Sequence, residues 1–291
     1  MMTSPRLLLA VVSVLAPCSA ALAHDFILWP RPGHLQAPGE VRLELWVGDH
    51  LAFEEQRGFQ VERADRFDRV DASGAHDLLA GRVDADPPFA TVALDHPGGH
   101  TLVLDRPAVR IELPADRFEH YLEHERLAGV VRERARRDES QRPGRERYTR
   151  HIKTFVQVGD RFDSAGCRAM GQPLEVVPLI DPARLAEGQV MEVELRRDGR
   201  ALGDHPLEAM TLVEGRPRST HMRTDARGRA RLRLDNEGEW LLRSVNMRRC
   251  EQNCDEVDWE SRWTAYTFHV GARGSHEPTR CSERRSARPR R

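Results

Sequence analysis

The chain has 291 residues, and its 45 basic residues are balanced by 46 acidic ones, which gives a formal net charge of −1. This balance provides no electrostatic reason to expect nucleic acid or another polyanion as a partner. The length allows one large domain or two domains of about 100–150 residues.

Residues 1–23 are predicted to be a signal peptide that directs export to the periplasm. A single arginine precedes an apolar run over residues 7–16, which is too short to span a bilayer. Residues 21–23 (ALA) then supply the small-x-small pattern of a cleavage site, so His24 becomes the first residue of the mature chain. The alternative is a lipoprotein signal cleaved at Cys18, but proline stands before this cysteine, where a small residue is needed.

The first half of the mature chain, residues 24–165, is predicted to be a β-rich domain with one helical insertion. Residues 41–47 alternate between apolar and polar side chains. Residues 91–94 and 101–104 are short strand-like runs, and the sequence between them (DHPGGH) is typical of a hairpin connection. Residues 115–137 instead combine good helix formers with apolar residues at helical spacing, so we expect one helix there.

The second half, residues 166–270, is predicted to be an immunoglobulin-like β-sandwich. Residues 190–195 alternate and run into an Asp-Gly turn, and residues 229–234 alternate with arginine on one side. The expected fold class is therefore mainly β, with two antiparallel β-sandwich domains and the helical insertion. Residues 271–291 are rich in Gly, Pro, Ser and Arg, and we expect them to be a disordered basic tail.

Four cysteines follow the predicted cleavage site: Cys167, Cys250, Cys254 and Cys281. Export places them in an oxidising compartment, where disulfides are expected. The candidates are a bond between Cys250 and Cys254, or a bond from one of these two to Cys167. A thiolate metal site at the Cys250–Cys254 pair is the alternative, although oxidation competes with it.

Lys153 is the only lysine of the chain, since every other Lys/Arg position is arginine. An ammonium group differs from a guanidinium in size and hydration, so a packed site that accepts only lysine would explain its presence. The alternative is drift in an arginine-rich composition.

His24 would offer two ligand atoms if it begins the mature chain, its imidazole and its α-amine. The pKa of an α-amine, about 7.7–8.0, lets a metal displace its proton at neutral pH. Such a chelate suits Cu(II) or Ni(II), which favour nitrogen ligands in tetragonal geometry. At least one further imidazole is needed to complete a site.

The best candidates for further ligands are His120 and His124, which are four residues apart and share one face of the predicted helix. Exposed helix histidines without a partner are the alternative. His96 and His100 flank a Gly-Gly turn, and His50 follows a Gly-Asp pair. Six other histidines show no pairing signal: His34, His76, His205, His221, His269 and His276.

Motifs of common enzyme classes are missing from the sequence. It contains no G-x-S-x-G elbow, no H-E-x-x-H zinc-protease helix and no phosphate-binding glycine loop. We therefore expect a binding protein rather than an enzyme. The enzymatic alternative is a copper enzyme that uses the His24 chelate for oxidative chemistry and needs a third histidine.

Several motifs in chain order resemble the periplasmic family of domains of unknown function numbered 4198, which is associated with nickel and cobalt uptake. They are residues 24–30 (HDFILWP, with Ile27 where tryptophan is usual), the helix around 118–127, 150–153 (RHIK), 174–178 (LEVVP) and 259–261 (WES). The resemblance implies a β-rich periplasmic protein with an immunoglobulin-like C-terminal half and a role in metal handling.

The resulting hypothesis is a periplasmic protein that binds a divalent transition metal, Ni, Co or Cu, beside a membrane metal transporter. Its expected ligands are His24, His100, His120 and His124. Asp25 and Lys153 are expected to support the site structurally. The alternative is a cell-envelope scaffold or binding module without a metal, and the oligomeric state stays open.

Overall fold

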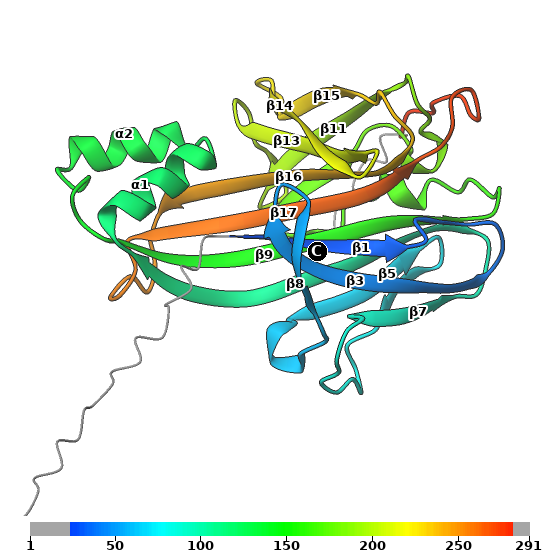
Figure 1. The fold of residues 1–291 in the computed structure, drawn as a ribbon, viewed down its shortest axis with the longest axis horizontal. Coiled ribbons are helices and arrows are strands. Elements are labelled where there is room, and N and C mark those ends of the chain that lie inside the picture. The colour runs from blue at the N-terminus through cyan, green and yellow to red at the C-terminus, as the bar shows by residue number, and fades with distance from the viewer. Residues whose placement is uncertain (1–23, 282–291) are drawn as a thin grey trace, which may run out of the picture.

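The computed structural model describes residues 24–281, and its fold is mainly β. The predicted signal peptide and the last ten residues of the predicted tail lie outside the described residues. A nine-stranded sheet forms the centre of the molecule (Figure 1). Its strands are β14 (Arg216–Arg223), β13 (Pro206–Val213), β16 (Gly238–Arg249), β17 (Trp259–Val270), β9 (Gly144–Val158), β8 (Gly98–Leu113), β5 (Arg66–Asp71) and β6 (Gly74–Asp77) in spatial order, with β2 (His34–Leu35) also paired to β9.

Two four-stranded sheets cover the central sheet. The first contains β1 (Asp25–Arg31), β3 (Gly39–Asp49), β4 (Ala52–Arg57) and β7 (Ala90–Leu94). The second contains β10 (Leu174–Pro178), β11 (Val190–Arg197), β12 (Arg200–Ala201) and β15 (Arg229–Arg233). Short 3-10 helices lie at Val61–Arg63, Ala165–Cys167 and Pro182–Arg184.

The two covering sheets pack on opposite faces of the central sheet, because successive strand residues point to opposite faces. In β16, Leu241 belongs to the apolar core beneath the first covering sheet, whereas Leu242 belongs to the core beneath the second. Met210 and Ala209 of β13 divide in the same way. The molecule is therefore a β-sandwich of three layers with two apolar cores.

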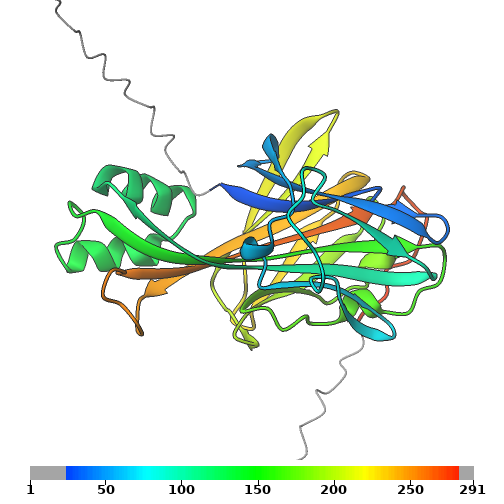
Figure 2. The ribbon, with the colours of Figure 1, turned by 90° about the horizontal axis from the view of Figure 1, so that it is seen from below.

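The two halves of the sequence share the central sheet. Strand β9 of the first half pairs in parallel with β17 of the second half, in register from Trp259 opposite Glu146 to Thr267 opposite Thr154. Figure 2 shows these green and orange strands running side by side. The expected boundary at residues 165/166 falls within the 3-10 helix Ala165–Cys167, and strands from both sides of it form one sheet.

The helical insertion at residues 115–137 forms two helices, α1 (Ala115–His124) and α2 (Ala128–Arg136), where the sequence predicts one. Arg126 has a φ of 56°, a left-handed conformation that ends a right-handed helix. Because of this break, Leu127 and Val130 pack in an apolar cluster with Trp259 and other side chains of the central sheet. Both helices lie together at one end of the long strands (Figure 1). Neither α-helix of the described residues is long and apolar enough to cross a membrane.

The predicted hairpin at residues 95–100 is also different in the structure. The strand before it, β7, pairs with β3 in the first covering sheet, whereas β8 belongs to the central sheet. Val92 and Leu102 enter the same apolar core from these two layers. Residues 95–97 therefore connect two layers, because both strands bury their side chains against each other rather than pairing edge to edge.

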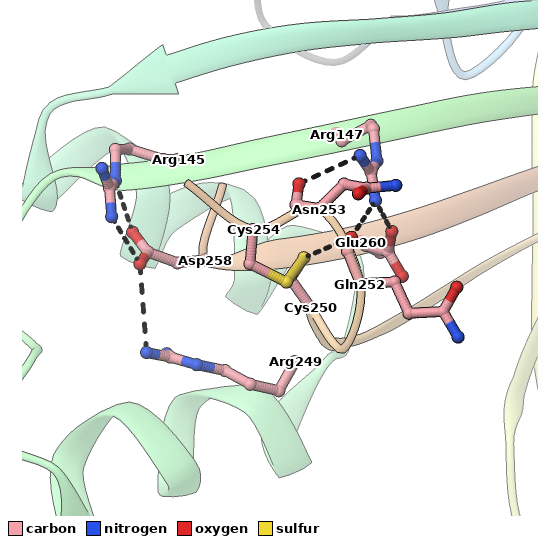
Figure 3. Close-up of a disulfide and its surroundings, with 9 residues drawn as sticks. All are labelled: Arg145, Arg147, Arg249, Cys250, Gln252, Asn253, Cys254, Asp258 and Glu260. Atoms are coloured by element: carbon pink, nitrogen blue, oxygen red, sulfur yellow. Dashed lines mark hydrogen bonds and ion pairs between the residues drawn. A yellow bond between two sulfur atoms is a disulfide. The ribbon is translucent and has the colours of Figure 1, made fainter. Parts of the chain in front are cut away.

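A disulfide joins Cys250 to Cys254 in the connection between β16 and β17, as one of the sequence alternatives predicts (Figure 3). The loop is also fixed to β9, where Arg145 donates two hydrogen bonds of 2.8 Å to Asp258 and Arg147 Nη2 donates to the Gln252 carbonyl. The two sulfur atoms are bonded to each other, so the structure does not support a thiolate metal site at this cysteine pair.

A second disulfide joins Cys167 to Cys281, a pairing that the sequence does not predict. It ties part of the expected disordered tail to the body of the molecule. The tail also pairs at Arg280 with Ile180, and the Asp181 N–H donates to the Thr279 carbonyl at 2.8 Å. Residues 271–281 are thus held by a covalent bond and backbone hydrogen bonds, which compensate for their lack of apolar side chains.

Candidate metal centres

The described residues contain two groups of histidine and carboxylate side chains whose ligand atoms lie within 4.8 Å of one another. One comprises Asp71, His96 and His100, and the other comprises Asp49, His50 and His124. His100 and Asp71 lie on the same face of the central sheet as the core residues Leu102 and Phe67, beneath the first covering sheet.

Three imidazoles lie near one carboxylate oxygen of Asp71: the two of the first group and that of His76, which is outside this group. The nitrogens near Asp71 Oδ2 are His76 Nε2 at 3.2 Å, His96 Nε2 at 3.5 Å and His100 Nδ1 at 3.9 Å. We call Asp71, His76, His96 and His100 the Asp71 cluster. The β5–β6 hairpin brings His76 beside Asp71. His96 lies in the β7–β8 connection, and His100 lies near the start of β8.

The buried half of the Asp71 cluster has two polar atoms without a hydrogen-bond partner, Asp71 Oδ2 and His100 Nδ1. Asp71 is 1% exposed and His100 is fully buried. His100 Nε2 lies 3.0 Å from the His96 carbonyl, to which it donates, so the lone pair of Nδ1 faces the carboxylate. Leaving a buried polar group without a hydrogen bond costs about 1–3 kcal/mol. Ion pairs with Arg69 and His76 offset part of this cost at Asp71 Oδ2, and a metal ion between Oδ2 and His100 Nδ1 would bind both atoms.

The protonation states of these groups favour metal binding. Burial works to raise the pKa of Asp71, but hydrogen bonds from Ser73 and His76 outweigh it and lower the pKa to about 2. Burial lowers the pKa of His100, so its imidazole is neutral. An ionised carboxylate and a neutral imidazole are the forms that bind a metal.

Arg69 positions the loop of the Asp71 cluster. Its Nη1 donates to the Ala93 carbonyl and to Asp95 Oδ1, both at 2.8 Å, and these groups lie just before His96. Its Nε lies 3.4 Å from Asp71 Oδ2. The guanidinium charge is therefore shared between two carboxylates, which limits its repulsion of a cation at the cluster.

The second group lies beside a buried arginine. Arg243 of β16 contacts three carboxylates: Asp25 Oδ1 at 2.6 Å, Glu125 Oε2 at 2.7 Å and Glu208 Oε2 at 3.0 Å. We call these four residues the Arg243 cluster. Burial raises the pKa of Asp25 to about 7, although Arg243 opposes this shift. Asp49, His50 and His124, which we call the rim triad, lie at the outer edge of this cluster.

The four histidines expected as ligands lie in different places. His100 belongs to the Asp71 cluster and His124 to the rim triad. His24 precedes β1, with its Nδ1 4.0 Å from Glu54 Oε2. His120 is exposed on α1 and lies outside both groups.

The two residues expected to give structural support are both buried. Asp25 contacts Arg243, as described above. Lys153 Nζ donates to Glu175 Oε1 at 2.6 Å, which joins β9 to β10 on the opposite face of the central sheet. Lys153, the only lysine of the chain, therefore occupies a packed site as expected, but this site belongs to neither metal-ligand group.

Sequence reasoning missed Asp71 and His76. No local spacing links Asp71 to His96 and His100, which follow 25 or more residues later. His76 has no pairing signal, because the β5–β6 hairpin alone brings it beside Asp71. The pairing of β5 with β8, which are distant in sequence, brings His100 to Asp71.

The fold and the clusters define a three-layered β protein with candidate metal-binding sites. A family model described as "Domain of unknown function (DUF4198)" matches residues 21–248, which is more than half of the chain. The chain therefore belongs to the DUF4198 family, as the sequence motifs indicate. No curated protein matches the chain.

Proposed function

We propose that this protein binds a divalent transition-metal ion at the Asp71 cluster and works in the cell envelope beside a metal-uptake transporter. The observation that carries the proposal is the buried pair of atoms without a hydrogen-bond partner, Asp71 Oδ2 and His100 Nδ1. His76 and His96, each with a side chain 39% exposed, close the cluster towards solvent. The predicted signal peptide and the nickel/cobalt association that the family resemblance implies support the place in metal uptake.

Three imidazoles and one carboxylate form a donor set that suits Zn(II), Ni(II), Co(II) and Cu(II). Hard ions such as Mg(II) and Ca(II) prefer all-oxygen sites, and Cu(I) prefers thiolates and thioethers. For a site of this kind the affinity order follows the general series, with Cu(II) tightest, then Ni(II), then Co(II).

Calorimetric titration of metal-free protein tests the proposal. Wild type is expected to bind Ni(II) with a Kd well below about 10 μM. His76→Gln and His96→Gln each remove one partly exposed ligand and are expected to weaken binding at this cluster about 10-fold or more. His120→Gln is the matched control, because this exposed histidine lies outside both groups, and its binding should equal that of wild type.

Two results would contradict the proposal. One is wild-type affinity weaker than about 10 μM for each of these metals, which would favour a metal-free scaffold or binding module. The other is unchanged metal binding in a His76→Gln/His96→Gln variant.

A further inference from the structure

The Arg243 cluster contains more negative than positive charge. Three carboxylates contact one guanidinium, and all four residues are less than 9% exposed. Two of their oxygens, Asp25 Oδ2 and Glu208 Oε1, are buried without a hydrogen-bond partner. A cation placed against this cluster would therefore gain Coulomb energy in a region of low dielectric.

The groups nearest to this excess charge are histidines. Glu208 Oε1 lies 3.7 Å from His50 Nε2 and 3.7 Å from His221 Nε2. This buried carboxylate oxygen, which has no hydrogen-bond partner, thus lies near two imidazoles. His221, Glu208 and Arg243 also line a small pocket that opens beside His124.

The rim triad completes the set of donors. His50 Nδ1 lies 3.2 Å from Asp49 Oδ1, and His124 Nε2 lies 3.6 Å from Asp49 Oδ2. The rings of His50 and His124 are 5.0 Å apart and perpendicular. Glu125 lies 3.3 Å from His124 Nδ1 and orients this ring, as a carboxylate does for many metal-ligating histidines.

The backbone supports this placement of His50. His50 and Leu51 form the two-residue turn between β3 and β4, and both have a left-handed conformation, with φ of 50° and 60°. Such turns favour Asn-Gly, so two residues with larger side chains carry strain. Leu51 is buried in the apolar core, which holds the turn in position and directs His50 to the rim.

We propose that Asp49, His50 and His124 form a second transition-metal site, for which the carboxylates of the Arg243 cluster supply the negative field. The site takes a divalent ion that accepts imidazole and carboxylate ligands, such as Zn(II), Ni(II) or Cu(II). It goes beyond the proposed function, because it shares no residue with the Asp71 cluster. Its three ligands are partly exposed, so its metal exchanges with solvent more readily than a metal at the Asp71 cluster.

The competing explanation for these histidines is electrostatic. Protonated imidazoles at positions 50, 124 and 221 would neutralise the same carboxylates without any metal. The number of metal ions bound per protein separates the two explanations. Protonated histidines would neutralise the carboxylates without any bound metal, whereas a second site binds one additional metal ion.

The experiment is equilibrium dialysis of the metal-free protein against Ni(II), with the bound metal measured by mass spectrometry. Wild type is expected to bind two equivalents. His50→Asn suits the left-handed turn, and His124→Gln changes an exposed helix end, so the His50→Asn/His124→Gln variant should fold and bind one equivalent. His120→Gln, on the same helix as His124, is the matched control and should bind two.

Each outcome is decisive for one site. Wild-type stoichiometry in the His50→Asn/His124→Gln variant overturns the second site, whatever happens at the Asp71 cluster. If His76→Gln/His96→Gln retains its full metal content while the rim variant loses one equivalent, the second site stands and the function proposed for the Asp71 cluster fails. The Cu(II)-loaded His76→Gln/His96→Gln variant should also show electron paramagnetic resonance coupling to nitrogen that disappears when His50 and His124 are replaced.

Discussion

Single buried side chains set much of the electrostatics of this protein, and Glu146 is the clearest case away from the metal clusters. Its Oε1 accepts hydrogen bonds from Tyr121 and Ser261, and its Oε2 is buried without a partner. Burial is the main cause that raises the pKa of Glu146 from 4.5 to about 7. The folded state therefore holds a proton in a pH range in which the unfolded chain releases it.

The first prediction concerns the pH dependence that Glu146 causes. Between about pH 4.5 and pH 7 the folded state binds more protons, so this residue lowers the free energy of unfolding as the pH rises. Glu146→Gln removes this effect. The free energy of unfolding of the variant minus that of wild type should therefore be higher at pH 8 than at pH 5, by up to about 3 kcal/mol. Urea unfolding of both proteins at the two pH values measures the difference, and an equal difference at both values would contradict the prediction.

The second prediction concerns His24, which the predicted cleavage site makes the first residue of the mature chain. Asp25, the first residue of β1, pairs with Gly48, so His24 directly precedes the strand end that lies next to Asp49 of the rim triad. A protein that begins at His24 has its α-amine at this position. It should bind Cu(II) about 10-fold more tightly than the same chain preceded by an initiator methionine, because the methionine removes the amine of His24 as a ligand. Equal affinities in a competition titration would count against a role for the amine.

The candidate metal ligands are positioned mainly by the turns and ends of helices and strands, and less by the regular parts of these elements. The rim triad depends on the β3–β4 turn and on the end of α1, and the Asp71 cluster depends on the β7–β8 connection. Alternation in the sequence correctly predicts strands such as β15, whose Ala230 and Leu232 are buried. It does not predict the sheet that a strand joins, because pairing partners depend on contacts that are distant in sequence.

The third prediction tests the break between α1 and α2. Arg126 is exposed and has a φ of 56°, which costs a residue with a side chain about 1–2 kcal/mol. Arg126→Gly should therefore raise the free energy of unfolding by about 1 kcal/mol. The matched control is Arg132→Gly, at an exposed position inside α2, which should lower it by about 1 kcal/mol. Thermal or urea unfolding would contradict this account if both variants were destabilised.

At the scale of the whole molecule, the two halves of the sequence share one sheet, and one long-range disulfide joins the C-terminal segment to the rest of the protein. The predicted mainly β class holds, and the Cys250–Cys254 pair was among the predicted disulfides. The parallel β9–β17 pairing and the Cys167–Cys281 bond could not be predicted. Composition alone indicates a disordered tail, because it takes no account of a covalent bond to a distant residue.

The fourth prediction compares the two disulfides. Cys167 and Cys281 are 114 residues apart, whereas Cys250 and Cys254 are four apart. In the chain-entropy model, the long loop contributes about 5 kcal/mol to stability and the short loop about 2 kcal/mol. The Cys167→Ser/Cys281→Ser variant should therefore lose more stability in urea unfolding than the Cys250→Ser/Cys254→Ser variant. The reverse order would show that the short disulfide acts mainly through the contacts of its loop with β9.

The central claim is that the Asp71 cluster binds a transition metal, and anomalous X-ray scattering from crystals of the Ni(II)-loaded protein tests it most directly. We expect an anomalous peak about 2.0–2.2 Å from Asp71 Oδ2 and from the nearest ring nitrogens of His76, His96 and His100. An anomalous map without a peak among these four side chains, from crystals that contain bound nickel, would contradict it.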